Sequence, residues 1–202
     1  FKSVSSDIKT SNKDNQKKII DISVEESPTG EIFAGAGTGT SGATISAGIQ
    51  EKNYLGKGIK LKTNILVSED EIKGKFQVEN PNFKNTDRSL NTIIESTASD
   101  FLSTGGFKTS RTGFGIGTGF EQYSDFFVNL DISAYYEKLE TSSTASEHKK
   151  KQEGDYLENL LSYGLTLNKL DQNFQPTDGY KLNFKQVLPI YSDDLSISNT
   201  IN

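Results

Sequence analysis

The chain has 202 residues, of which 33% are hydrophobic and 24% charged, and its formal net charge is −5. It contains no cysteine, which excludes disulfides and thiolate metal sites, and the acidic balance provides no basic face for nucleic acid. No segment approaches the ~18 consecutive apolar residues of a transmembrane helix, so a chain that crosses a membrane by helices is excluded as well.

The first 29 residues differ in pattern from the rest of the chain. Polar residues at Asp7–Gln16 predict a hairpin-like connection, and alternating apolar and polar residues in Lys17–Glu26 predict one β-strand. The sequence SPTG at residues 27–30 then interrupts the alternation. We therefore expect residues 1–29 to be the end of a small domain with its linker, and a second domain to cover residues 30–202.

From residue 30 onward, segments of roughly ten residues are apolar at every second position, which is typical of half-buried β-strands. Turn residues such as proline and glycine separate these segments. Ten strands are predicted in all. They are expected at residues 31–40, 43–50, 59–68, 71–79, 87–96, 112–120, 128–136, 156–170 and 180–188, with a tenth that begins at Asp194.

The predicted connections alternate in length. Those after the second, fourth, sixth and eighth strands are expected to be short, including a tight reversal within Asp171–Tyr180. Those after the fifth and seventh are expected to be long, the longest being Lys138–Glu158. Outer-membrane barrels have short turns on one side and longer loops on the other. The prediction is therefore an all-β, antiparallel transmembrane β-barrel wall, with a soluble β-sandwich as the alternative that shares the alternation.

Glycines occupy alternate positions in two of the predicted strands, at Phe33–Gly39 and Gly113–Gly119. A phosphate-binding loop needs its glycines in a turn that opens a helix, whereas no helix follows here. We expect lumen-facing glycines that let a strand curve or another backbone approach closely. The strand at residues 31–40 carries so few side chains that it should pair weakly.

Nothing in the sequence indicates an enzyme. The single histidine, His148, lies in a polar segment that offers no shelter for a Ser-His-Asp triad. The acidic segments Glu69–Glu71 and Asp193–Asp194 offer oxygen ligands for a hard cation, but solvated loop tips are the favoured interpretation. We assign no catalytic, cofactor-binding or metal-binding residue and expect no cofactor.

Four short motifs occur in an order and at a spacing that closely resemble the BamA family of outer-membrane protein insertases. They are VEESPTGEI at residues 24–32, EKNYLGKG at 51–58, ENPNF at 79–83 and DQNFQPTDG at 171–179. The resemblance covers essentially the whole chain. It implies that residues 1–29 end the last POTRA domain in the periplasm. Residues 30–202 would then form about ten strands of a sixteen-stranded barrel in the bacterial outer membrane.

In that family, an insertase folds client barrels into the membrane through a weakened seam, where a client strand pairs with the first barrel strand. The resemblance implies unfolded outer-membrane β-barrel clients, accessory lipoproteins and outer-membrane lipid as partners, and no nucleic acid. A glycine-rich edge suits strand addition. The implied seam residues are Glu31, Phe33, Gly35, Gly37 and Gly39. The turn residues expected to fix strand register are Asn53, Gly56, Gly58, Pro81, Phe83, Asp171, Pro176, Thr177 and Gly179.

Three parts of the family pattern have no counterpart in these 202 residues: the closing strand, the inward-folded external loop with an Arg-containing motif, and nearly all POTRA repeats. We therefore expect the sequence to be part of a longer protein. Two alternatives to an insertase stay open. One is a related transporter, either TamA-like or a two-partner secretion pore. The other is a passive porin or structural envelope barrel, which needs no strand exchange.

Overall fold

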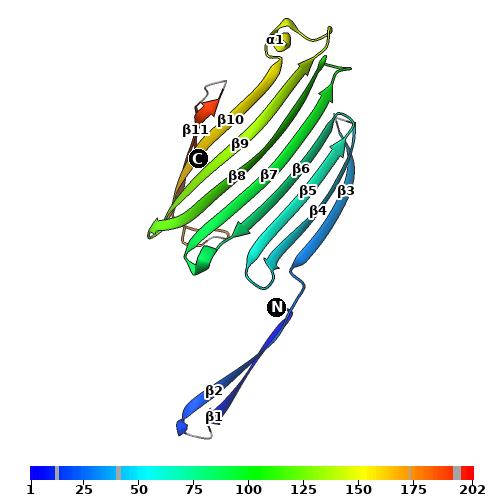
Figure 1. Cartoon of the computed structure of the whole chain (residues 1–202). Coiled ribbons are helices and arrows are strands. Elements are labelled where there is room, and N and C mark those ends of the chain that lie inside the picture. Colours follow the sequence, from blue (N-terminus) through cyan, green and yellow to red (C-terminus); the bar gives the residue numbers. More distant parts are fainter. Residues whose placement is uncertain (12–13, 40–41, 173, 193–196) are drawn as a thin grey trace. The chain divides into compact units, whose positions relative to one another are not determined.

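The computed structural model describes residues 1–11, 14–39, 42–172, 174–192 and 197–202. These residues divide into two units, Phe1–Gly30 and Glu31–Asn202, and each is described by itself. Both units consist almost entirely of antiparallel β-strands (Figure 1). No helix within the described ranges is both long enough and apolar enough to cross a membrane.

The first unit is a two-stranded hairpin of β1 (Ser3–Ser11) and β2 (Asp14–Glu25). The expectation of a single strand after a polar connection was therefore wrong. Polar residues of β1 lie in the strand and interact with residues of β2, and do not form a loop. Lys9 Nζ, for example, lies 2.9 Å from a carboxylate oxygen of Asp21 on β2. One face of the hairpin is nevertheless apolar and exposed. It carries Val4, Ile8, Ile20, Ile22 and Val24.

The second unit is one sheet of ten antiparallel strands in which every strand pairs with its neighbours in sequence. Within the described residues, β3 and β12 form the two edges (Figure 1). The strands are β3 (Gly30–Gly39), β4 (Gly42–Tyr54), β5 (Ile59–Ser68), β6 (Glu71–Asn80), β7 (Arg88–Phe101), β8 (Phe107–Tyr123), β9 (Phe126–Thr141), β10 (Gly154–Asn168), β11 (Lys181–Ser192) and β12 (Ser198–Ile201).

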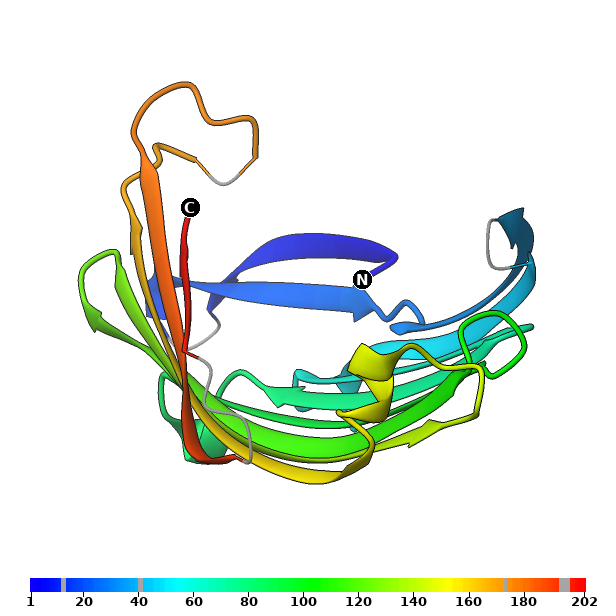
Figure 2. The same cartoon turned by 90° about the horizontal axis from the view of Figure 1, so that it is seen from above.

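The sheet curves into an open trough, seen from above in Figure 2. Apolar side chains such as Phe114 and Ile132 are 57% and 54% exposed on the convex face. The glycines identify the concave side, where side chains converge. A Cβ atom added to Gly113 would collide with the Tyr135 ring, whereas one added to Gly74 on the convex face would meet nothing within 4 Å. The predicted lumen-facing position of the β8 glycines is confirmed.

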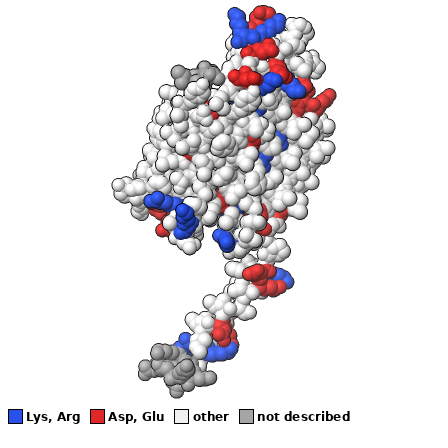
Figure 3. Space-filling model, in the orientation of Figure 1, with Lys and Arg blue, Asp and Glu red and all other residues white. Residues whose placement is uncertain are grey.

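Several polar side chains on the convex face bond to one another or to the backbone. This arrangement suits contact with hydrocarbon, where no water is present to satisfy a polar group. The face drawn in Figure 3 is largely free of charge between the two ends of the sheet. On this face the Ser96 and Thr112 hydroxyls bond to each other at 2.7 Å, and the Thr118 hydroxyl donates to the Ser89 carbonyl at 2.8 Å. The Tyr163 hydroxyl donates to the Gln186 side chain at 2.6 Å, and Gln186 donates in turn to the Asn199 side chain at 2.6 Å.

Several strands are longer than their apolar pattern, which corrects the predicted loops. The connection expected at Lys138–Glu158 is limited to residues 142–153 and contains the short helix α1 (Glu147–Lys150). Backbone pairing continues there beyond the apolar band, with Leu139 opposite Gly154 and only 6% exposed. Similarly, β8 begins at Phe107, so the connection after the fifth strand is short.

The predicted alternation of short and long connections was wrong. The connection after the eighth strand of the sheet, between β10 and β11, spans residues 169–180. It has the same length as the 142–153 connection after the seventh strand, whereas the prediction made one short and the other long. It is therefore not a tight reversal. Loop length alone does not assign the two ends of this sheet to the two sides of a membrane. The predicted start of the tenth strand at Asp194 lies outside the described residues.

Candidate functional site

The edge strand β3 is the least covered part of the sheet. It is hydrogen-bonded to β4 on one side, every one of its residues is exposed, and no described strand pairs with its other side. A strand with one free edge presents a row of backbone N–H and C=O groups that can pair with another extended chain. This edge is therefore a candidate site for strand addition.

Side chains hold only the first half of β3 to the sheet. The Glu31 carboxylate lies 2.5 Å from Lys52 Nζ on β4. The Phe33 ring occupies the space that a side chain on Gly48 would need. The glycines that follow contribute no such contacts, and a Cβ added to Gly37 would meet nothing within 4 Å. Gly39 lies in the same open environment. The second half of β3 is thus held mainly by its backbone, and Thr40 lies outside the described residues.

The connection from β4 to β5 forms a tight turn around Asn53. Its side-chain oxygen accepts a hydrogen bond of 2.6 Å from the backbone N–H of Gly58, and its own N–H donates to Glu51 over 2.6 Å. Gly56 and Gly58 have φ angles of +69° and +68°, a region that glycine adopts without a Cβ penalty. These bonds join both ends of the turn between the two strands.

The connection from β6 to β7 begins at Pro81 and contains a short 3₁₀ turn, Phe83–Asn85. The Asn80 side chain accepts a hydrogen bond from the N–H of Asn82 at 3.2 Å, and the Thr86 hydroxyl donates to the Phe83 carbonyl at 2.7 Å. Proline cannot extend the strand because it lacks an N–H group. The segment closes the strand end locally and makes no contact that indicates chemistry.

The fourth motif, at residues 171–179, is organised by one carboxylate, that of Asp171. It accepts hydrogen bonds from the hydroxyl of Thr177 at 2.6 Å, from the Thr177 N–H at 3.1 Å and from the Gln172 N–H at 3.0 Å. These donors, led by the Thr177 hydroxyl, hold the pKa of Asp171 below its ordinary value. Pro176 precedes Thr177, and Gly179 has a φ of +95° with its α-carbon against the Lys169 carbonyl.

Sequence reasoning missed an ion pair that joins two connections at one end of the sheet. Lys169 Nζ lies 2.7 Å from Asp125, which sits in the two-residue turn between β8 and β9. The Asp125 carbonyl also accepts from the Asn168 N–H at 2.9 Å. The Lys169 hydrogen bond lowers the pKa of Asp125. Only the register of β9 on β10 brings these residues together. Asn168 Oδ1 is buried without a partner among the described residues, and nothing in the structure explains it.

The concave face carries a charge network centred on Arg111 of β8. Its guanidinium lies 2.9 Å from Glu158 and 3.8 Å from Glu137, and it stacks 4.2 Å above the centroid of the Tyr135 ring. The partners come from β9 and β10, so the network ties three strands together across the wall. The one guanidinium thus faces two carboxylates, of which Glu158 is the nearer.

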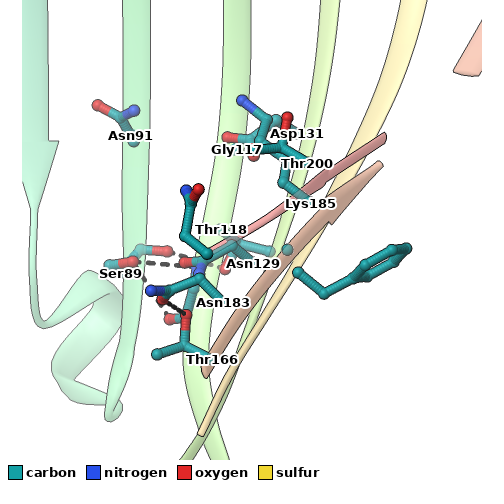
Figure 4. A pocket seen from close by; sticks show the side chains of 14 residues that line it. Ser89, Asn91, Gly117, Thr118, Asn129, Asp131, Thr166, Asn183, Lys185 and Thr200 are labelled. Atoms are coloured by element: carbon teal, nitrogen blue, oxygen red, sulfur yellow. Dashed lines mark hydrogen bonds between the residues drawn. The ribbon is translucent and has the colours of Figure 1, made fainter. Parts of the chain in front are cut away.

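A separate polar hollow of about 430 Å³ lies on the concave face, and Gly117, Gly119 and Gly164 are among the residues that line it. Figure 4 labels ten of its lining residues. Asparagine, serine and threonine side chains line most of it, with one carboxylate and one ammonium group, Asp131 and Lys185. Among the described residues that line it there is no histidine, and the one aromatic residue is Phe184. It has the character of a wet lumenal wall.

The acidic and basic residues considered as ligands do not converge. Glu71 is engaged by Lys73 at 2.8 Å and by the Ser99 hydroxyl at 3.1 Å. No group of three potential ligand side chains occurs within the described part of the chain. Asp193 and Asp194 lie outside it. His148 is exposed within α1.

Three comparisons with known proteins bear on this wall. Residues 53–200 match the model of the Omp85 superfamily domain. The chain is 29% identical over 182 residues to the outer membrane protein assembly factor BamA of Neorickettsia risticii, covering 85% of this chain and 23% of that protein. In fold it matches the crystal structure of BamA from Haemophilus ducreyi lacking POTRA domains 1–3, with a TM-score of 0.71 and 23% identity.

The structural match covers 96% of this chain and 40% of the Haemophilus chain, and it shows that the ten-stranded sheet has the fold of part of a BamA barrel. The chain spans less than a quarter of the length of its curated relative. The superfamily model, by contrast, covers well over half of this chain and includes the turns at Asn53, Pro81 and Asp171. The chain therefore belongs to the Omp85 superfamily.

Proposed function

We propose that the chain is part of an outer-membrane assembly factor that folds and inserts β-barrel proteins by strand templating at β3. The observation that carries this proposal is the free edge of β3, whose second half is held mainly by its backbone. Pairing a client strand with such an edge adds main-chain hydrogen bonds without any new side-chain chemistry. No cofactor or nucleotide is required.

The proposed location is the bacterial outer membrane, with the convex face of the sheet in contact with lipid. The exposed apolar side chains of that face and the internally paired polar groups among them support this placement. The proposed partners are unfolded β-barrel clients and accessory lipoproteins of an assembly complex. The similarity to a BamA protein supports both, and nucleic acid is not among them.

For the first unit we propose the end of a periplasmic POTRA domain. Its hairpin has one exposed face of aliphatic residues, including Ile20 and Ile22, which two strands alone cannot bury. Such a face requires a further layer of the same domain to cover it. Replacing Ile22 with aspartate should unfold this domain in the full-length protein, measured as faster proteolysis, while Ser23 to aspartate on the opposite face should not.

The proposal is tested with the full-length protein in liposomes and an outer-membrane protein released from urea. A photo-crosslinking residue replaces Ala36 on β3, and the same residue replaces Ile45 on β4 as the control one strand inward. Faster client folding together with a client crosslink from position 36, and none from position 45, is the expected result. Equal crosslinking from both positions, or no acceleration, contradicts templating at this edge.

The same experiment separates the alternatives. A protein that conducts ions stably but leaves client folding unchanged is a porin or a secretion pore. A TamA-like transporter would accelerate a narrower range of clients, so several clients of different strand number are compared. No observation on this chain favours either alternative over the insertase.

A further inference from the structure

A second hollow lies on the concave face between β5 and β6. It encloses about 270 Å³ and is lined by four side chains: Lys62, Asn64, Lys75 and Gln77. Strand register places Lys62 opposite Gln77 and Asn64 opposite Lys75. The four residues therefore form a square grid, in which the two ammonium groups occupy one diagonal and the two amides the other.

Lys62 lacks the ion-pair partner that neighbouring lysines have. On the same two strands, Lys60 lies 2.8 Å from Glu79, and Lys73 lies 2.8 Å from Glu71. Within the described ranges, by contrast, no carboxylate lies at ion-pair distance from Lys62. The imbalance is local, because the charges on both sides of the hollow are compensated.

Lys75 has only a distant carboxylate, and the flanking strands add no other. Its Nζ lies 3.8 Å from Glu95 of β7. On the other flank, the β4 residues opposite Lys62 and Asn64 are Gln50 and Gly48, which are uncharged. The hollow therefore keeps an excess of positive charge.

The amides add further hydrogen-bond donors to this excess. Gln77 uses one N–H to reach Asn91 at 3.2 Å and retains a second. The Asn64 side chain makes no hydrogen bond within the part of the chain that is described. Like charges on adjacent strands repel unless an anion lies between them. We propose that this grid is an oxyanion-binding site, which takes a carboxylate or phosphate group into the lumenal wall.

The site does not depend on the insertase proposal, because an oxyanion can bind whether or not β3 templates a strand. Two charge-assisted hydrogen bonds from the ammonium groups would hold the anion, with amide N–H groups completing its shell. Lysine binds a phosphate as a point charge and imposes no planar geometry, so carboxylate and phosphate are both accepted. The lumenal face is wet, so the binding is weak and reversible.

Amine labelling of the full-length protein in phosphatidylcholine liposomes tests the site. Labelling rates of Lys62 and Lys75 are measured by mass spectrometry in phosphate, in acetate and in chloride at equal ionic strength. Phosphate and acetate should slow both rates by about 2- to 5-fold relative to chloride, the range of a partly exposed ion pair. Lys185, another concave-face lysine without an ion-pair partner in the described structure, is the matched control and should not respond.

One variant keeps the test independent of folding defects. Asn64→Asp places a carboxylate beside both lysines, so it should remove the protection by added anions while the heat-modified gel mobility of the barrel stays normal. Equal labelling in all three salts, or equal protection at Lys185, overturns the proposal.

If phosphate and acetate protect Lys62 and Lys75 from labelling, two further experiments identify the source of the oxyanion. Protection on adding phosphatidylglycerol to the vesicles assigns the site to a lipid headgroup, and protection on adding an unfolded client assigns it to polypeptide carboxylates. Both outcomes support the site.

Discussion

Single polar residues form the side-chain hydrogen bonds that close two of the connections between strands. The Asp171 carboxylate binds two donors of Thr177 and so closes the 169–180 connection upon itself. Asn53 does the same for the 51–58 turn with one side-chain oxygen. In each case the oxygen of a short polar side chain accepts a hydrogen bond from a backbone N–H in the connection, where no paired strand provides an acceptor.

The first prediction concerns Asp171→Asn. Because native hydrogen bonds depress the pKa of this carboxyl below its ordinary value of 3.8, its contribution to stability is present above that pH and is lost as the pH falls through the native pKa. The variant should therefore unfold at a lower temperature than the parent at pH 7, and the difference should vanish in strong acid. Heat-modified gel mobility measures it. A difference that persists unchanged at low pH contradicts the assignment.

The second prediction compares two glycines with positive φ. A side chain at Gly56 has open space around it, so Gly56→Ala should cost only the backbone penalty of about 1–2 kcal/mol. At Gly179 the added Cβ would also collide with the Lys169 carbonyl. Gly179→Ala should therefore lower the thermal unfolding midpoint more than Gly56→Ala does. Equal midpoints would show that the 169–180 connection relaxes without cost.

At the scale of elements, the curvature of the sheet makes its two faces unequal. On β8, glycines at alternate positions leave room for side chains of β9, such as Tyr135 over Gly113 and Asp131 over Gly117. On the convex face the neighbouring side chains diverge. The same strand is therefore crowded on one side and open on the other, and glycine is needed only on the concave side.

A matched pair of alanine substitutions tests this difference. Gly113→Ala drives a Cβ atom against the Tyr135 ring and the Ala134 carbonyl and should destabilise the barrel by about 1–3 kcal/mol. Gly74→Ala meets nothing within 4 Å and removes backbone freedom from the unfolded chain, so it should be neutral or slightly stabilising. Urea titration of the refolding equilibrium gives both values. Destabilisation by both variants alike would argue against the assigned faces.

At the scale of the whole molecule, the sheet separates two solvents. The convex face exposes aliphatic and aromatic side chains, while the concave face carries paired and unpaired charges together with amides. A soluble sandwich would bury one of these faces against a second sheet of the same unit, whereas the described residues of Glu31–Asn202 form a single sheet. The ten strands instead follow one another in a single curved layer, as in part of a BamA barrel.

The fourth prediction tests this separation in the full-length protein. Residues 1–202 contain no tryptophan, so a tryptophan introduced at Ile132 reports the convex face and one at the adjacent Ser133 reports the concave face. Brominated lipid should quench the added fluorescence of Ile132→Trp several times more strongly than that of Ser133→Trp. Fluorescence of the parent protein is subtracted in both cases. Equal quenching would contradict a lipid-facing convex surface.

The sequence by itself determined the strand pattern, the division of faces and the family resemblance. Alternation at every second residue is a local property of an extended chain, so Val128, Leu130 and Ile132 could be placed on one face without knowledge of any neighbour. The turn motifs could also be predicted from the sequence, because proline and glycine act through local backbone geometry.

Only the tertiary structure decided where strands end, how long the connections are and which charges remain unpaired. Lys138 and Glu140 look like loop residues, yet they lie in β9 because backbone pairing with β10 continues past the apolar band. The Lys169–Asp125 pair and the unpaired Lys62 depend on the register between strands. Hydrogen bonding between strands joins residues far apart in the chain, and no local pattern records which of them will meet.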